Sequence, residues 1–284
     1  MSELIEYLQS RLVYGVEIPP RKMELRYSNQ PFCPRKYYID QRTPLPESAT
    51  TSITMKLILE LGHVFHQVVQ NIFAYSHTED FKLLGFFDED GNYVEYEFGN
   101  EFPLSPTGHA DGLIWWRGRY LVMELKTIND NGFVKLTQPK SEHRVQASCY
   151  GKRFTKMGFP IDGILFLYVN RTAVLDFLNR NSLDYYQFFE IPFEPWYADW
   201  YEQLVDYAVQ NNEVDHIPLG ICRTPNEMSW CPYSQECSRV NLPYLDKSEE
   251  AIEFRKFINI LYPSNEQLLE SKGVSFLNGS AKRV

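Results

Sequence analysis

Two strand-like segments near the middle of the chain carry ionisable side chains among apolar neighbours. The stretch GHADGLIWWRGRYLVMELKT, residues 108–127, contains Asp111 in its first half and Glu124 and Lys126 in its second half. Burying a charge in a strand is costly in free energy unless the charge is paired or binds a metal. These three residues are therefore the first candidates for a site that does chemistry.

The expected hairpin brings the three side chains together. Alternate residues of a strand point to the same face, so Glu124 and Lys126 share one face of the second strand. Gly118 lies in the short segment RGR and is the natural pivot of a turn. Folding the chain back at this glycine places Asp111 opposite Glu124 and Leu125.

Two carboxylates that converge repel each other unless a positive charge lies between them. Mg²⁺ or Mn²⁺, which prefer oxygen ligands, would meet that need. A lysine beside the pair could neutralise developing negative charge or position a water. Such a set suits metal-assisted hydrolysis of a phosphodiester bond. The alternative is that Glu124 and Lys126 form an ordinary ion pair on a solvated strand.

A long helix is expected before the hairpin, over residues 51–73, because apolar residues recur there at helical spacing. Gly62 and His66 form G-x-x-x-H on this helix, and the imidazole could bind a metal. A single histidine on a helix can equally be an ordinary core residue.

A second helix is expected after the hairpin, with Ser141 as its N-cap and Gly158 as its stop. His143, Gln146 and Tyr150 lie on one face of it. Polar atoms on a face that meets the sheet need partners, which a DNA backbone or the hairpin lysine could supply. An ordinary amphipathic helix is the alternative.

Strand-like and helical segments alternate along the chain, which favours a mixed α/β sheet with helices added at both ends. Further strands are expected at 81–87, 92–98, 163–171 and 186–193, and further helices at the start of the chain, at 194–211 and at 248–262.

Length and composition limit the classes of protein to consider. The chain has 284 residues, of which 44% are hydrophobic, enough for the core of one large domain. It has no apolar run of about 18 residues, and the opening MSELIEYLQS lacks the apolar centre of a secretory signal. We therefore expect a cytoplasmic protein with no membrane partner and with reduced cysteines.

The formal net charge of −9 argues mildly against a polyanionic partner. Binding depends on local basic groups, however, and three short basic segments are present, at 21–26, 35–36 and 152–156. They could contact nucleic acid or simply be solvated. The sequence contains no G-x-x-x-x-G-K-[ST] phosphate loop, so an NTP-driven motor is not expected.

In order along the chain, the segments GHVFH, GHADG, ELK and QASCY resemble the RecB-type branch of the PD-(D/E)XK nuclease superfamily. The resemblance covers about residues 60–170 and implies a restriction-endonuclease-like core, a mixed central sheet flanked by helices. We expect a single domain, 1–284, whose catalytic core spans about 55–195. The implied metal ligands are His66, Asp111, Glu124 and the carbonyl of Leu125; Lys126 is catalytic; Gln146 and Tyr150 support the site or contact the substrate backbone.

The cysteines resemble a branch of this family that is clasped by an iron–sulfur cluster, namely CRISPR-adaptation exonucleases and helicase–nuclease repair subunits. The resemblance implies a [4Fe–4S] cluster held by one early and three late cysteines, which would join about 25–40 to 215–245. These cysteines are Cys33, Cys222, Cys231 and Cys237. Zinc could use the same four thiolates.

One departure from the family pattern concerns Cys222. The usual spacing before Cys231 is C-x₂-C, and Met228 stands where that cysteine would be. The fifth cysteine, Cys149, is expected to be a small buried apolar residue.

The implied function is that of a metal-dependent DNA nuclease, an exonuclease acting on single strands or DNA ends in repair, recombination or replication. It would act alone or with helicase or recombination proteins, in a bacterium or a virus. Two alternatives stay open: a catalytically silent nucleic-acid-binding module, and an iron–sulfur structural or redox protein.

Overall fold

The computed structural model describes residues 22–43, 53–99, 106–172, 185–229, 231–240, 243 and 246–263. The helix expected at the start of the chain lies outside this range. The strands are β1 (Phe81–Leu84), β2 (Phe86–Phe87), β3 (Tyr93–Val94), β4 (Tyr96–Phe98), β5 (Gly108–Ala110), β6 (Gly112–Trp116), β7 (Arg119–Ile128), β8 (Ile161–Asn170) and β9 (Tyr186–Pro192). The helices are α2 (Pro34–Arg42), α3 (Ile53–Tyr75), α4 (Asp130–Phe133), α5 (Ser141–Lys156), α7 (Trp196–Glu213), α8 (Pro225–Ser229), α9 (Ser234–Val240) and α10 (Glu249–Leu261).

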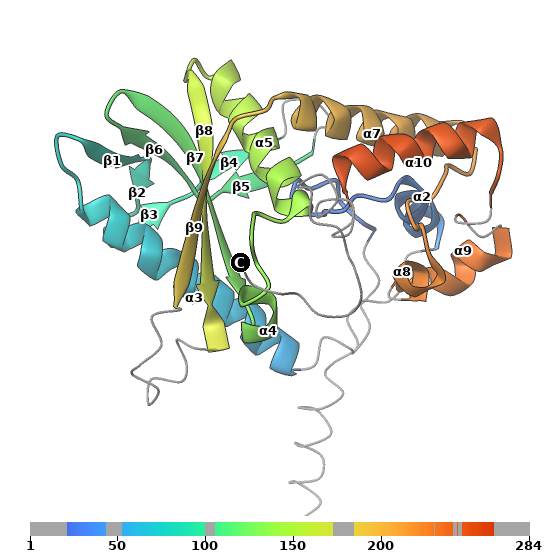
Figure 1. Cartoon of the computed structure of the whole chain (residues 1–284), viewed down its shortest axis with the longest axis horizontal. Helices are drawn as coiled ribbons and strands as arrows, with labels where there is room; N and C mark the ends of the chain where they lie inside the picture. The colour runs from blue at the N-terminus through green and yellow to red at the C-terminus, as the bar shows by residue number, and fades with distance from the viewer. Residues whose placement is uncertain are drawn as a thin grey trace, which may run out of the picture.

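A mixed five-stranded sheet forms the centre, in the order β1-β6-β7-β8-β9. Strands β7 and β8 are parallel, and the other neighbours are antiparallel. The expected mixed α/β sheet flanked by helices is therefore confirmed (Figure 1). The hairpin between β6 and β7 turns at Arg117 and Gly118, both with positive φ, so Gly118 is the pivot that the sequence predicts.

Helices cover both faces of the central sheet. On one face, α3 packs Val69 and Phe73 against Leu125 of β7 and Leu167 of β8. On the other face, α5 belongs to the large core cluster that contains Val122, Ile164 and Phe166. The continuous apolar run of β8 is explained by this double coverage.

Two expected strands are each divided in the structure. Segment 81–87 separates into β1 and β2 around Gly85, where an added Cβ would lie 2.4 Å from the ring of Tyr93. Segment 92–98 separates into β3 and β4, which join two different two-stranded sheets. The break leaves Glu95 outside both strands.

The start of α5 differs from the prediction by one residue. Lys140 is the N-cap, and Ser141 is the first helical residue, with its hydroxyl bonded to the Glu142 carboxylate. The helix begins there because the carbonyl of Lys140 already accepts from the amides of His143 and Arg144. The predicted stop is correct, since Gly158 follows the helix with φ of +97°.

The early and late parts of the chain meet beside the sheet, where α2 lies near α7, α8, α9 and α10 (Figure 1). Several hydrogen bonds join them. The amide of Phe32 donates to the Tyr262 hydroxyl at 3.3 Å, and Arg35 Nε donates to the carbonyl of Pro218 at 2.8 Å. The described helices include none with the length and apolar character needed to cross a bilayer.

Candidate metal centre and cysteine cluster

Asp111 lies between β5 and β6, next to the residue that begins the central hairpin. Gly112 pairs with Met123, which places Asp111 level with Glu124 across the hairpin. The Oδ2 atom of Asp111 accepts a hydrogen bond from the amide of Leu125 at 2.5 Å. The structure thus brings Asp111 to the part of β7 that the sequence predicts.

Glu124 is fully buried, with 0% of its surface exposed. The Nζ atom of Lys126 lies 2.5 Å from Glu124 Oε1, while Oε2 has no hydrogen-bond partner among the described residues. A pair on a solvated strand is therefore excluded. A buried carboxylate oxygen without a partner is costly in free energy, and its presence next to Asp111 marks this place as unusual.

His66 reaches the same place from α3. Its Nδ1 atom lies 3.1 Å from Asp111 Oδ1 and 3.8 Å from Glu95 Oε1. His66, Glu95 and Asp111 offer ligand atoms that all lie within 4.8 Å of one another, the spacing of a possible metal site. Gln70 supports the group, since its Nε2 donates to Glu95 Oε1 at 2.8 Å and to the Asp111 carbonyl at 2.9 Å.

Glu95 was not predicted from the sequence. It is the residue between β3 and β4, and its second oxygen lies 3.9 Å from Nδ1 of His109. A weak signal was available, because Glu95 is one of two acids in the aromatic segment NYVEYEF. Nothing in that segment alone says that α3 packs beside it.

The charges at this centre depend on one another. Burial raises the pKa of Glu124 to about 7, against the opposing attraction of Lys126. Burial alone would lower the pKa of His66, but the charge and hydrogen bond of Asp111 outweigh it and raise that pKa to about 10. Burial likewise opposes ionisation of Asp111, yet the charge of His66 keeps its pKa below the usual value. A protonated His66 therefore provides the positive charge that a cation could provide instead.

Gln146 and Tyr150 lie behind the acidic residues rather than on the surface. Gln146 Nε2 donates to the Tyr150 hydroxyl at 3.1 Å, and the two residues are 7% and 1% exposed. The Tyr150 ring packs edge-on against Tyr27. Both side chains therefore lie inside the core, joined to each other behind Glu124 and Asp111.

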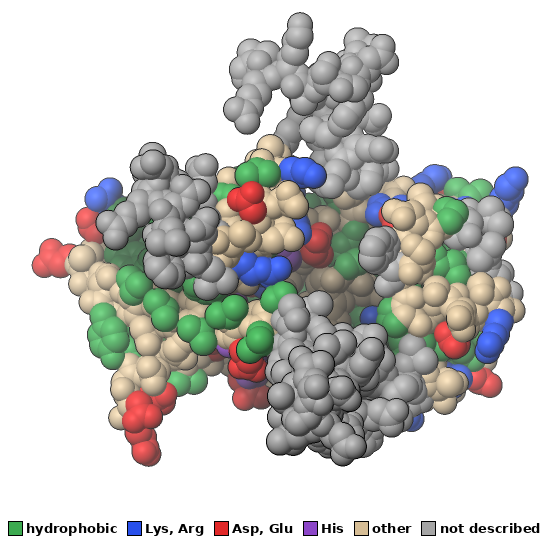
Figure 2. Space-filling view, turned by 90° about the horizontal axis from the view of Figure 1, so that it is seen from below, with side chains coloured by type: hydrophobic (Ala, Val, Ile, Leu, Met, Phe, Trp, Pro, Cys, Tyr) green, Lys and Arg blue, Asp and Glu red, His purple; other side chains and the backbone are tan. Residues whose placement is uncertain are grey.

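Several side chains of the basic segments pair with other residues of the chain. Arg26 pairs with Glu24, and Arg35 is buried. Lys152 pairs with two acids of α7, and Arg153 donates to the Tyr27 hydroxyl at 2.7 Å. In the space-filling view, basic, acidic and histidine side chains lie near one another at the middle of the face shown, where the surface is hollowed (Figure 2).

Four cysteines lie in one neighbourhood, in the part of the molecule where the early and late segments meet. Cys33 caps α2 and Cys237 lies on α9, while Cys222 and Cys231 pack against the small cluster that contains Cys237. Burial raises the pKa of Cys222 to about 12, and the charges of the other three thiols add to the effect. Cys149 is buried in α5, as predicted.

Two polar groups already point to the sulfur atoms. The amide of Lys36 donates to Cys33 Sγ at 3.4 Å, and Nη1 of Arg35 lies 3.9 Å from Cys237 Sγ as a donor. Burial raises the pKa of both thiols, and these donors oppose that rise. Met228 is buried in the same cluster, so the residue at the missing cysteine position packs with the three late cysteines.

No family model matches this chain, and no curated protein sequence matches it. Among solved structures, one described as "Crystal structure of SSO0001" is similar, with a TM-score of 0.40 and 15% identity. That alignment covers 83% of this chain and 96% of the other. A similarity this low does not indicate a function.

Replacing Glu124 should change how stability depends on pH in metal-free protein. The folded-state pKa of Glu124, about 7, lies above its ordinary value of 4.5. The protonated side chain therefore stabilises the folded protein fully below pH 4.5, and this stabilisation is lost as pH rises through about 7. We expect Glu124→Gln to reduce the fall in Tm between about pH 5 and 7.5 by about 3 °C.

The measurement is thermal unfolding in chelator at several pH values, with exposed Glu97→Gln as the matched control. If the Glu124 variant loses as much Tm as the parent over this interval, the buried carboxylate is not ionising there and the assignment is wrong.

Proposed function

We propose that this protein is a metal-dependent nuclease that hydrolyses phosphodiester bonds of DNA, built on a restriction-endonuclease-like core. The observation that carries the proposal is the buried carboxylate of Glu124, which has an unpartnered oxygen beside Lys126 and lies level with Asp111. A divalent cation would recover the free energy that this burial costs. Incidental surface charges would not be built into the centre of a sheet.

The proposed cation is Mg²⁺ or Mn²⁺. His66, Glu95 and Asp111 lie close enough together to hold it, and Glu124, level with Asp111 across the hairpin, is the further proposed ligand. A role for the Leu125 carbonyl rests on the family resemblance, while the amide of Leu125 holds Asp111 in place. When bound, such an ion lowers the pKa of a water molecule and stabilises negative charge on phosphate oxygens.

Lys126 is placed to act on the same phosphate. Burial would lower the pKa of Lys126, but the negative charges of Glu124 and Asp111 raise it, so the ammonium stays charged. Its side chain is 22% exposed and can reach a substrate. A fixed positive charge here would stabilise the charge that develops on the phosphate during attack by water.

The substrate that fits best is a DNA single strand or a DNA end, cut as an exonuclease would cut it, in repair, recombination or replication. The resemblance of the ordered motifs supports this choice. Helicase or recombination proteins are the proposed partners. The proposed location is the cytoplasm, for a protein of bacterial or viral origin. We further propose that the four clustered cysteines hold a [4Fe–4S] cluster, with zinc as the alternative, and so clasp α2 to α8 and α9.

Binding of the cation should release a proton, because His66 must lose the proton that its raised pKa retains. We expect calorimetric titration with Mn²⁺ at about pH 8, in buffers of different ionisation enthalpy, to report release of about one proton per ion. The His66→Gln variant should release none and bind more weakly. Equal proton release by the two proteins would remove His66 from the ligand set.

Hydrolysis should require Lys126. We expect the parent to degrade labelled DNA with Mg²⁺ or Mn²⁺, and Lys126→Ala to be slower by about 100-fold, the usual effect of removing one charge-stabilising group. Lys156→Ala, an exposed residue of α5, is the control and should match the parent. Labels at each end in turn report the direction of digestion.

If the parent binds DNA but degrades none with either metal, the protein is a binding module and the nuclease proposal is wrong. Equal activity of the parent and Lys126→Ala would contradict the assigned role of the lysine.

The cysteine proposal predicts a brown protein when it is purified without oxygen. Elemental analysis should find about four irons per chain, and Cys33→Ala should lose most of them, whereas Cys149→Ala should keep them. A colourless protein that contains stoichiometric zinc would replace the iron–sulfur proposal and leave the nuclease proposal standing.

A further inference from the structure

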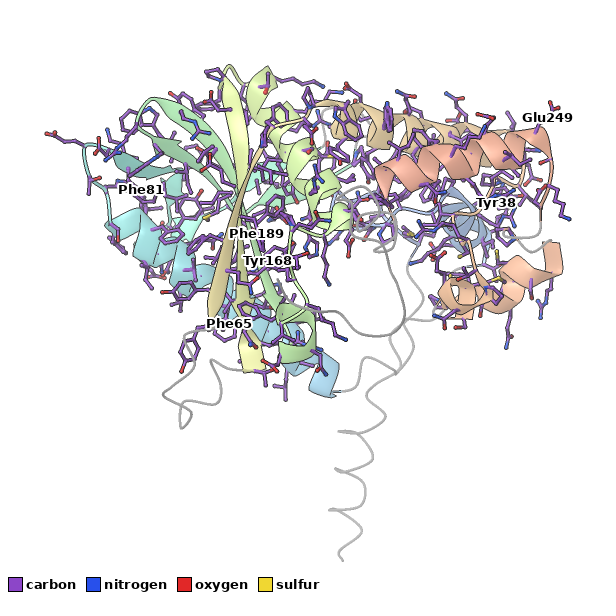
Figure 3. All side chains as sticks on the ribbon, in the orientation of Figure 1. Tyr38, Phe65, Phe81, Tyr168, Phe189 and Glu249 are labelled. Carbon is purple, nitrogen blue, oxygen red and sulfur yellow. The ribbon has the colours of Figure 1, made fainter. Side chains whose placement is uncertain are left out.

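A tyrosine lies beside Lys126 on the neighbouring strand. The register of β7 and β8 pairs Glu124 with Phe166 and Lys126 with Tyr168. Paired residues of neighbouring strands share a face of the sheet, so Tyr168 lies on the same face as Lys126. Its ring is fully buried and packs edge-on against Phe189 with centroids 5.9 Å apart (Figure 3).

The hydroxyl of Tyr168 joins this face of the sheet to the start of α5. It accepts a hydrogen bond from the amide of Lys140 at 3.1 Å and lies 2.7 Å from Nδ1 of His143. A hydroxyl has a single proton to donate. The Lys140 amide can only donate, so of the two described groups bonded to this hydroxyl only Nδ1 can accept its proton. We assign the proton to Nδ1 on that ground, which places the ring proton of a neutral His143 on Nε2.

The surroundings keep His143 neutral. Burial lowers the pKa of His143 to about 2, and the positive charges of Lys126 and Lys140 act in the same direction. The ring is half-buried, and Nε2 has no hydrogen-bond partner among the described residues. His143 therefore presents a neutral N–H donor in the first turn of a 16-residue helix, where the charges of Lys126 and Lys140 act on it.

These groups together favour an anion. An N–H donor, nearby ammonium groups and a helix N-terminus all attract negative charge. A neutral donor binds a phosphate oxygen without giving up its proton, and it avoids the cost of burying a further positive charge.

We propose that His143, oriented by Tyr168, donates its Nε2–H to a non-bridging oxygen of a substrate phosphate next to Lys126. His143 contacts the substrate, and Tyr168 is a positioning residue. The inference rests on the proposed function, because it assigns a substrate contact to the same site. It also adds a phosphate contact that does not depend on the cation.

Two substitutions of His143 test the contacts of its two ring nitrogens separately. Asparagine can keep the contact at the Nδ1 position with Tyr168 but has no donor at the Nε2 position, whereas glutamine offers an amide donor near Nε2. We expect His143→Asn to bind a fluorescent single-stranded oligonucleotide about tenfold more weakly, as the loss of one hydrogen bond to a charged group predicts. His143→Gln should stay within about threefold of the parent, and Tyr168→Phe should lie between them.

Binding is measured by fluorescence anisotropy with Ca²⁺ in place of the catalytic cation and again in chelator, with unfolding curves to show that each variant is folded. In digestion assays His143→Asn should raise KM more than it lowers kcat. The pH profile of kcat/KM should be the same for His143→Gln and the parent, because a neutral donor does not titrate.

The outcomes distinguish this inference from the nuclease proposal. The proposed contact is wrong if His143→Asn binds the oligonucleotide as tightly as the parent, or if His143→Asn and His143→Gln lose the same amount of affinity. Either result would overturn it even if the parent digests DNA. A shifted pH profile for His143→Gln would also overturn it, since the imidazole would then be exchanging protons. If the variants differ in binding as expected but the parent digests nothing, the contact stands and the nuclease proposal fails.

Discussion

The burial of the Glu124 carboxylate beside Lys126 is the interaction on which the rest of this site depends. Strand β7 carries both residues on one face, and its other face is apolar and covered by α3. The chain thus places charge at the centre of its core, where solvent cannot stabilise it. Asp111 and His66 then complete a set of charges that a proton on the imidazole balances, and that the proposed metal ion would balance in its place.

The sequence predicted the parts of the site that follow from local periodicity. Strand alternation placed Glu124 and Lys126 on one face, and the glycine turn set the register that brings Asp111 level with Glu124. Glu95 could not be found in this way, because its position depends on how α3 packs against the link between β3 and β4. The contact between Gln70 and Glu95 joins residues 25 positions apart, and no local pattern reports such a contact.

The same limit applies to the rest of the fold. The sheet and its flanking helices followed from alternation of strand and helix patterns, whereas the cap of α5 was misassigned by one residue because tertiary contacts hold Lys140. Cys33 is distant in sequence from the three late cysteines and meets them only because α2 packs against the late helices. Hydrogen bonds such as that between Phe32 and Tyr262 join the same segments, so a metal at the cysteines would reinforce an interface that already exists.

Diffraction from crystals soaked in Mn²⁺, with anomalous differences collected at the manganese edge, tests the central claim most directly. A strong peak should lie between the carboxylates of Asp111 and Glu124, within coordinating distance of His66, and it should vanish in Glu124→Gln crystals. A peak elsewhere, or none in crystals of the parent protein, would contradict the assignment of this buried charge to a metal centre.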